Sequence, residues 1–337
     1  MRKTKAITML VGTTLVFSGG GLAATAAEAD PSVTPDSVQS ALGQAFPEAL
    51  SGLATESTTR DAKIAMSATG GSTSIDVPTD PTSGIGFTSS SGEKLSIGVP
   101  FAASANDAFV VQPGVVAYDN ANGSATVPAV KADGSVQIST VIESASAPTR
   151  YDYALDLPEG AELVLLESNG AKVKGKDGST LLNIAQPVAY DSAKNVVPTK
   201  YEISGHTLTQ VVELSESASY PIVADPWLNC ELIGAVSVTY PYPEANRYKV
   251  NVTPSTCGEG WVGPLTWGNW EDELRDKLGA DADKVNYTVR EQLNCHLAGF
   301  PLSLPEFNLE SWRADQTYTQ MAPYNCNYPE GGWGSAS

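Results

Sequence analysis

Short stretches of alternating apolar and polar residues dominate the middle of the chain. Pairs of residues that favour turns separate these stretches, among them Asn122-Gly123, Asp133-Gly134 and Asp177-Gly178. Short strands with regular turns, and no helical pattern in the intervals, are typical of antiparallel β-structure. We therefore predict an antiparallel β-sandwich-like domain over residues 73–226. Its clearest strands are expected at residues 136–142, 151–157, 162–166, 200–203 and 207–214.

A single helical pattern precedes this domain. Thr34 is a favourable N-cap, Pro35 follows at the first helical position, and apolar residues from Val38 to Phe46 share one face. A run rich in Ser, Thr and Gly comes next, at about residues 55–73. We expect residues 27–72 to form a short helix and a flexible linker.

Two strands and two helices are expected after residue 226. Apolar residues alternate over 233–239 and 248–253, whereas residues 268–278 and 287–298 have helical spacing. Asn269 is expected to cap the first of these helices, and Gly279 and Gly299 to end the two. Residues 227–337 are thus predicted to form a small α+β domain, and the chain as a whole to be mostly β.

Composition supports a boundary at the same place. All six Trp and all four Cys residues lie at or after Trp227, whereas the chain before it is rich in Ser, Thr, Ala, Val and Gly. Such a change predicts two domains that meet near residue 226.

The first 26 residues have the features of a secretory signal peptide. Arg2, Lys3 and Lys5 precede an uncharged stretch, and small residues at Ala24 and Ala26 form an A-x-A cleavage site. The apolar part is too short to cross a bilayer, and no later segment is long and apolar enough to do so. We expect a secreted protein, extracellular or associated with the cell wall, without a membrane span after cleavage.

The net charge of the chain and the spacing of its possible metal ligands argue against some classes of function. The formal net charge is −18, and cleavage would remove three positive charges and no negative ones. Binding to phosphate backbones depends on clustered Lys and Arg, so we expect no nucleic-acid partner. The two His residues lie in different predicted domains and no Cys pair has C-x-x-C spacing, so we expect no metal site and no cofactor. An even number of Cys residues in an exported chain predicts disulfides instead, made by Cys230, Cys257, Cys295 and Cys326.

Three motifs in the last part of the chain resemble a known family. They are Arg290-Glu-Gln-Leu-Asn-Cys-His296, Phe307-Asn-Leu-Glu-Ser-Trp-Arg313 and Asn325-Cys-Asn327. Residues 227–331 resemble the domain of unknown function 2599 of secreted actinobacterial proteins, which pairs a Gln-x-x-Cys-His helix with an Asn-Leu-Glu-x-Trp-Arg segment and a late Cys-Asn-Pro-Gly. The last motif is altered here to Cys326-Asn-Tyr-Pro-Glu-Gly331. The family implies no activity, because its function is unassigned.

The resemblance also implies a disulfide pairing. Cys295 and Cys326 both lie in the matching motifs, so they are expected to pair with each other. Cys230 and Cys257 would then form the second bridge.

His296 is the candidate catalytic residue. Its helix position places it on one stripe with Val289, Leu293 and Phe300, which favours a half-buried core histidine. The alternative is a general acid or base, with Glu310 orienting the imidazole and with Arg290 and Arg313 holding an anion. His206 is expected in a surface turn between two strands.

The clustered tryptophans have two interpretations. Trp261, Trp267 and Trp270 can supply the core of a small domain, or they can line a groove that stacks on sugar rings. We favour the core, because small domains depend on large aromatic side chains for burial.

The sequence leads to two functional hypotheses. The first is an exported binding or structural module of the cell envelope or extracellular space, with an unknown extracellular ligand. The alternative is a secreted hydrolase or nuclease-like effector that uses His296 as its general acid or base.

Overall fold

Two antiparallel sheets face each other in the β-rich part of the chain. The computed structural model describes residues 33–54, 62–70, 73–89, 92, 94–215, 217–229, 231–242, 246–255, 258, 266–299 and 305–327, which belong to one compact unit. The predicted signal peptide lies outside these residues. The first sheet has seven strands in the order β1 (Ile64–Gly70), β2 (Thr73–Pro78), β3 (Ile85–Ser89), β4 (Lys94–Ile97), β9 (Arg150–Asp156), β15 (Thr207–Val212) and β14 (Thr199–Ser204).

The second sheet has ten strands. Eight of them follow the order β10 (Glu162–Leu165), β11 (Ala171–Lys174), β12 (Thr180–Ile184), β17 (Trp227–Leu228), β8 (Val136–Ile142), β7 (Ser124–Val130), β6 (Val115–Asp119) and β5 (Phe109–Gln112). Strand β16 (Ile222–Asp225) pairs with β8 and with β13 (Val188–Tyr190). The five strands predicted most clearly from the sequence are β8, β9, β10, β14 and β15, and all are confirmed within one or two residues at each end.

One apolar core joins the two sheets, and it comes from alternate residues of their strands. Ile75 and Phe87 of the first sheet belong to the same buried cluster as Ile138 and Val173 of the second. Strand β9 shows the alternation most clearly, because Tyr151, Tyr153 and Leu155 are buried while the residues between them are exposed. The chain is therefore mostly antiparallel β with a sandwich-like N-terminal part, as predicted.

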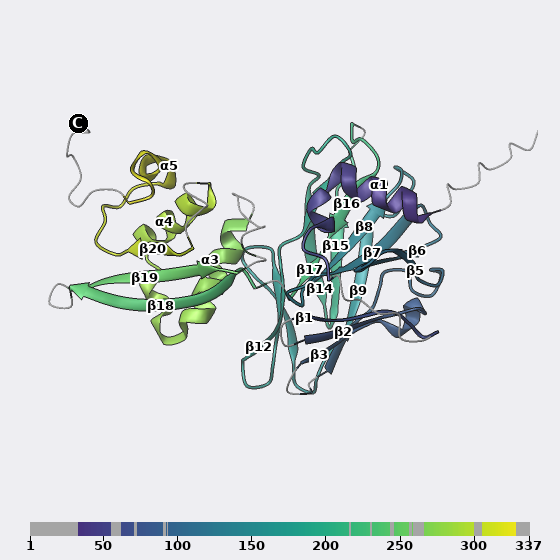
Figure 1. Cartoon of the computed structure of the whole chain (residues 1–337), viewed down its shortest axis with the longest axis horizontal. Coiled ribbons are helices and arrows are strands. Elements are labelled where there is room, and N and C mark those ends of the chain that lie inside the picture. Colours follow the sequence, from purple (N-terminus) through teal and green to yellow (C-terminus); the bar gives the residue numbers. More distant parts are fainter. Residues whose placement is uncertain are drawn as a thin grey trace, which may run out of the picture. The chain divides into compact units, whose positions relative to one another are not determined.

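Helix α1 (Pro35–Ala45) covers the outer face of the ten-stranded sheet (Figure 1). Thr34 caps it as predicted, since its Oγ1 accepts a hydrogen bond from the Ser37 N–H and the Ser37 hydroxyl accepts one from the Thr34 N–H. The buried face, with Val38 and Leu42, packs against strands β5, β8 and β16. A 3₁₀ turn, η1 (Pro47–Leu50), follows directly. A second, η2 (Pro81–Ser83), connects β2 to β3.

Strand β1 lies in the segment where we expected a flexible linker. It pairs with β2 over most of its length, and the Ser67 hydroxyl donates to Asp76 Oδ1 at 2.5 Å. The prediction of a linker is wrong over Ile64–Gly70, because burial of Met66 and its small neighbours outweighs the weak β-propensity of this stretch. Residues 55–61 and 71–72 lie outside the described part.

The ten-stranded sheet also continues past residue 226. Trp227–Leu228 form β17 between β8 and β12, and Trp227 Nε1 donates to Ser135 Oγ at 2.9 Å. The change in composition marks where the tryptophan and cysteine residues begin, and the last strand of the sheet ends two residues after residue 226.

A three-stranded antiparallel sheet with helices forms the C-terminal part. Its order is β18 (Ile233–Tyr242), β19 (Arg247–Pro254) and β20 (Phe307–Glu310). Helix α3 (Trp267–Leu278) packs on β18 and α4 (Tyr287–Leu297) on β20 (Figure 1). The other elements of its described residues are η5 (Gly279–Lys284), α5 (Tyr318–Met321) and η6 (Ala322–Tyr324).

The ends of these helices differ in how well they were predicted. Helix α3 begins at Trp267, so Asn269 lies inside the helix and the prediction that it is the N-cap is wrong. Helix α4 is capped by Asn286, whose Oδ1 accepts from the Val289 N–H at 2.9 Å. Gly279 and Gly299 follow the two helices with positive φ, as predicted. None of the described helices is both long enough and apolar enough to cross a bilayer.

Candidate functional site

His296 is buried in the core of the C-terminal part. Only 1% of its surface is exposed, and its ring stacks on Phe307 of β20 with 4.7 Å between centroids and 4° between planes. Val289 and Leu293, predicted on the same stripe of α4, are fully buried. Phe300, the fourth member of that stripe, lies outside the described residues. The core interpretation of His296 fits this environment.

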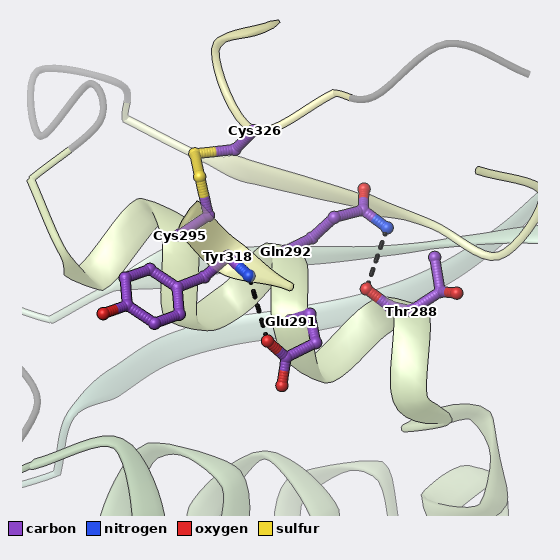
Figure 2. Close-up of a disulfide and its surroundings, with 6 residues drawn as sticks. All are labelled: Thr288, Glu291, Gln292, Cys295, Tyr318 and Cys326. Carbon is purple, nitrogen blue, oxygen red and sulfur yellow. Dashed lines mark hydrogen bonds between the residues drawn. A yellow bond between two sulfur atoms is a disulfide. The ribbon is translucent and has the colours of Figure 1, made fainter. Parts of the chain in front are cut away.

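Gln292 connects α4 to the edge of strand β20. Its side chain is fully buried, its Nε2 donates to the carbonyl oxygen of Glu310 at 2.9 Å, and its Oε1 accepts from the Glu310 N–H at 2.9 Å. A strand neighbour would make the same pair of bonds, so the amide takes the place of one residue of a fourth strand. Nε2 also donates to the Thr288 carbonyl one turn earlier (Figure 2).

The neighbouring motif residues hold the segment that follows β20. The Glu291 carboxylate accepts the Tyr318 N–H at 3.0 Å, at the first turn of α5, and Cys295 forms a disulfide with Cys326 (Figure 2). The pairing of Cys295 with Cys326 is therefore confirmed. Cys230 and Cys257 lie outside the described residues, and their pairing stays a prediction.

The predicted partners of His296 make other contacts. The Glu310 carboxylate forms an ion pair with Arg313 three residues later. Arg290 Nη2 lies 3.3 Å from Glu291 Oε1, and its guanidinium lies over the Tyr287 ring at 5.1 Å. His296 comes six positions after Arg290, which places their side chains roughly 120° apart around α4. The structure thus brings together Glu310 and Arg313, but it places Arg290 on another side of the helix from His296.

No protein-family model matches the chain, and no curated protein is similar to it. The resemblance of residues 227–331 to the domain of unknown function 2599 therefore stays a prediction, carried by the three motifs alone.

Trp270 and His206 lie as the simpler interpretations predicted. Trp270 is fully buried, and Trp267 packs edge-on against Tyr318 with 4.7 Å between ring centroids. Trp261 lies outside the described residues. His206 is exposed in the two-residue turn between β14 and β15, beside Gly205 at a φ of 58°. Within the described ranges, no three His, Cys, Asp or Glu side chains are placed to hold a metal ion.

A buried pair of charged residues in the β-rich part escaped sequence analysis. Lys131 is 3% exposed and Asp225 is 1% exposed. Burial lowers the pKa of Lys131 to about 8, although Asp225 and Asp133 oppose this shift. Burial raises the pKa of Asp225 to about 7, against the hydrogen bond from Gln137 and the charge of Lys131. No local pattern marks either residue, because their burial depends on elements that are distant in the sequence.

Proposed function

We propose that the protein is an exported module that binds to or organises the cell envelope or extracellular material. The support comes from how the motif residues are used. Gln292 completes the edge of a sheet, Glu291 and the disulfide fix the following segment, and His296 fills the core. Side chains engaged in this way stabilise a scaffold, and a scaffold suits a protein whose role is to present a surface.

The enzymatic alternative requires a reachable acid–base group. A general base has to lie within hydrogen-bond distance of the proton that it removes, either directly or through one water. His296 is 99% buried behind Phe307, and the Glu310 carboxylate is paired with Arg313. A nuclease-like role is further disfavoured by the net charge of −18, which repels a phosphate backbone.

We favour the surface around two exposed tyrosines as the place where a ligand binds. In the described C-terminal part, Tyr240 and Tyr287 are the large apolar side chains with high exposure, at 46% and 43%. A cation lies close to each: Arg290 over the Tyr287 ring, and Lys284 over Tyr248, which is next to Tyr240 at 6.5 Å between centroids. Exposed aromatic rings offer flat apolar faces on which the sugar rings of a wall polymer can stack.

Co-sedimentation with insoluble cell-wall material tests this proposal. We expect the purified exported chain to be retained by the pellet, and the Tyr240→Ser/Tyr287→Ser variant to be released into the supernatant. Val110→Ser is the matched control, because Val110 is 51% exposed on β5 and should have no effect on retention. Lack of retention of the wild-type chain would contradict a binding role, and release of soluble fragments from the polymer would favour the hydrolase.

A further inference from the structure

Helix α3 has one apolar face and one strongly polar face. Trp270 and Leu274 are fully buried in the C-terminal core. Asn269, Asp272, Glu273 and Asp276 follow the spacing of 3, 4 and 7 residues that places side chains on one stripe. Glu273 and Asp276 line the same small cavity as Ala171 and Asn183 of strands β11 and β12. The polar face of α3 is therefore the one in contact with the ten-stranded sheet.

The two sides of this contact approach closely. Asp276 forms an ion pair with Lys172 of β11, whose side chain is only 8% exposed. A Cβ atom on Gly268, in the first turn of α3, would lie 2.7 Å from the Ser168 Cβ, and one on Gly170 would lie 3.5 Å from Asn269 Oδ1. The helix and the sheet are thus close together, but the residues in contact are polar. Polar contacts between domains are typical of domains that move relative to each other.

Glu273 ties the connection between the two parts to the same helix. Its two carboxylate oxygens accept the N–H groups of Leu232 and Ile233 at 2.8 and 2.9 Å, where the chain passes from β17 to β18. The side chain is 10% exposed and has Lys277 at 3.9 Å. The Glu273 carboxylate therefore fixes the segment that connects the two parts. This segment would be the hinge of any motion between them.

The charges around Asp272 and Glu273 are unbalanced. Burial raises the pKa of Glu273 to about 7 in spite of its two N–H donors, and burial also raises the pKa of Asp272. The charged groups that face these two carboxylates are the acids Glu231, Glu271 and Asp276 and the bases Lys172 and Lys277. Of these groups only Lys172 belongs to the sheet, so separation of the helix from the sheet would not relieve repulsion between acids; it would restore water to the ionised Asp272 and Glu273, whose burial penalises the charged form.

Protonation would also add a hydrogen-bond donor where one is missing. Asn269 Oδ1 and Asp272 Oδ2 are buried acceptors that receive no hydrogen bond from the described residues. A carboxylate only accepts, whereas a protonated carboxyl group donates through its O–H. Since Asn269 and Asp272 are one turn apart on α3, a proton on Asp272 would satisfy both positions.

We propose that the polar face of α3 is a proton-dependent clasp, which closes the C-terminal part onto strands β10–β12 in mildly acidic surroundings and loosens at alkaline pH. The closed state binds protons more strongly than an open state in which Asp272 and Glu273 face water. By linkage, lower pH then favours the closed state.

Small-angle X-ray scattering of the full exported chain tests the clasp. We expect the radius of gyration to increase between pH 5.5 and pH 8.5, with a midpoint near 7 and no change in secondary structure by circular dichroism. The Asp272→Asn/Glu273→Gln variant should lose most of this pH response, since its amides stay neutral. Asp107→Asn, which removes one exposed acid from a loop, should keep the wild-type response.

Two results would overturn the proposal. One is a wild-type radius of gyration that does not change with pH, and the other is a pH response that persists in the double variant. If Glu273→Gln impairs folding by losing one backbone contact, Asp272→Asn alone decides, because Asp272 bonds no backbone N–H in the described contacts and should still reduce the response.

Discussion

Lys131 Nζ lies 2.7 Å from the carbonyl oxygen of Ala49. The same ammonium group donates to the carbonyls of Ser51 and Glu48, at 2.9 and 3.3 Å, and it lies 5.4 Å from the Trp227 ring. A single side chain of the sheet thus holds the end of η1, which has no further helical turn to satisfy these carbonyls. The N-terminal segment is fixed to the sandwich by this contact together with the apolar face of α1.

Lys131→Met should destabilise the protein while preserving its shape. The methionine fills a similar volume but leaves three carbonyl oxygens with fewer donors, which costs about 1–3 kcal/mol. We expect a fall of several degrees in the melting temperature, measured by differential scanning calorimetry. Lys176→Met, at an exposed position, is the control and should change little. Equal melting temperatures for the two variants would show that the contact contributes nothing.

Gln292→Leu should weaken the C-terminal part most. Leucine is apolar and of similar size, but it leaves the N–H and carbonyl groups of Glu310 without their partner. Each unsatisfied buried group costs about 1–3 kcal/mol. Urea unfolding followed by tryptophan fluorescence should give a lower midpoint with an unchanged slope.

Gln39→Leu is the matched control for this change, since Gln39 is an exposed glutamine on α1. Its midpoint should stay close to that of the wild type. A wild-type midpoint for Gln292→Leu would contradict the role of the amide as a substitute for a strand neighbour.

How much could be predicted depended on whether the signal was local. The capping of α1 by Thr34 and Pro35, and the alternation in β8 and β9, are properties of adjacent residues, and these elements were predicted well. Strand β1 was missed because only its pairing with β2 makes it a strand. In the sequence, Lys131 has the pattern of a solvent-exposed residue before a turn. It is buried because η1 packs over it.

The candidate site was predicted to a similar extent. The helical stripe that includes Val289 and Leu293 correctly favoured a buried His296, since burial follows from helix phase. The engagement of Arg313 with Glu310 could not be deduced, because it depends on how the chain turns after β20. The sequence marks Gln292 only as part of a motif. Its bonds to Glu310 could not be predicted, because they join residues 18 positions apart.

Asp225 should make the stability of the protein depend on pH between about 4 and 7. Its folded-state pKa of about 7 lies above the usual value of 3.8, so the folded protein holds a proton that the unfolded chain releases. Stability from this group is therefore greatest at low pH and is lost as pH rises toward 7. The loss is on the order of a few kcal/mol.

Asp225→Asn removes the titrating group and should remove this part of the pH dependence. We expect the melting temperature of the variant, relative to the wild type, to be higher at pH 8 than at pH 5. Asp107→Asn, an exposed change of the same charge, should show no such difference. A constant offset between Asp225→Asn and wild type at both pH values would mean that Asp225 titrates normally.

His296→Ala separates the structural role of this residue from a catalytic one. The substitution removes a ring that stacks on Phe307 and is 1% exposed, so we expect the free energy of unfolding to fall by about 1–3 kcal/mol. His206→Ala, in the exposed turn between β14 and β15, should leave stability unchanged. A catalytic histidine would give the opposite pattern, with an unchanged melting temperature and loss of whatever release of soluble fragments the wild-type protein shows on cell-wall material. A core histidine lowers the melting temperature when it is removed and a catalytic one leaves it unchanged, so the melting curves of the wild type and the variant distinguish the two roles.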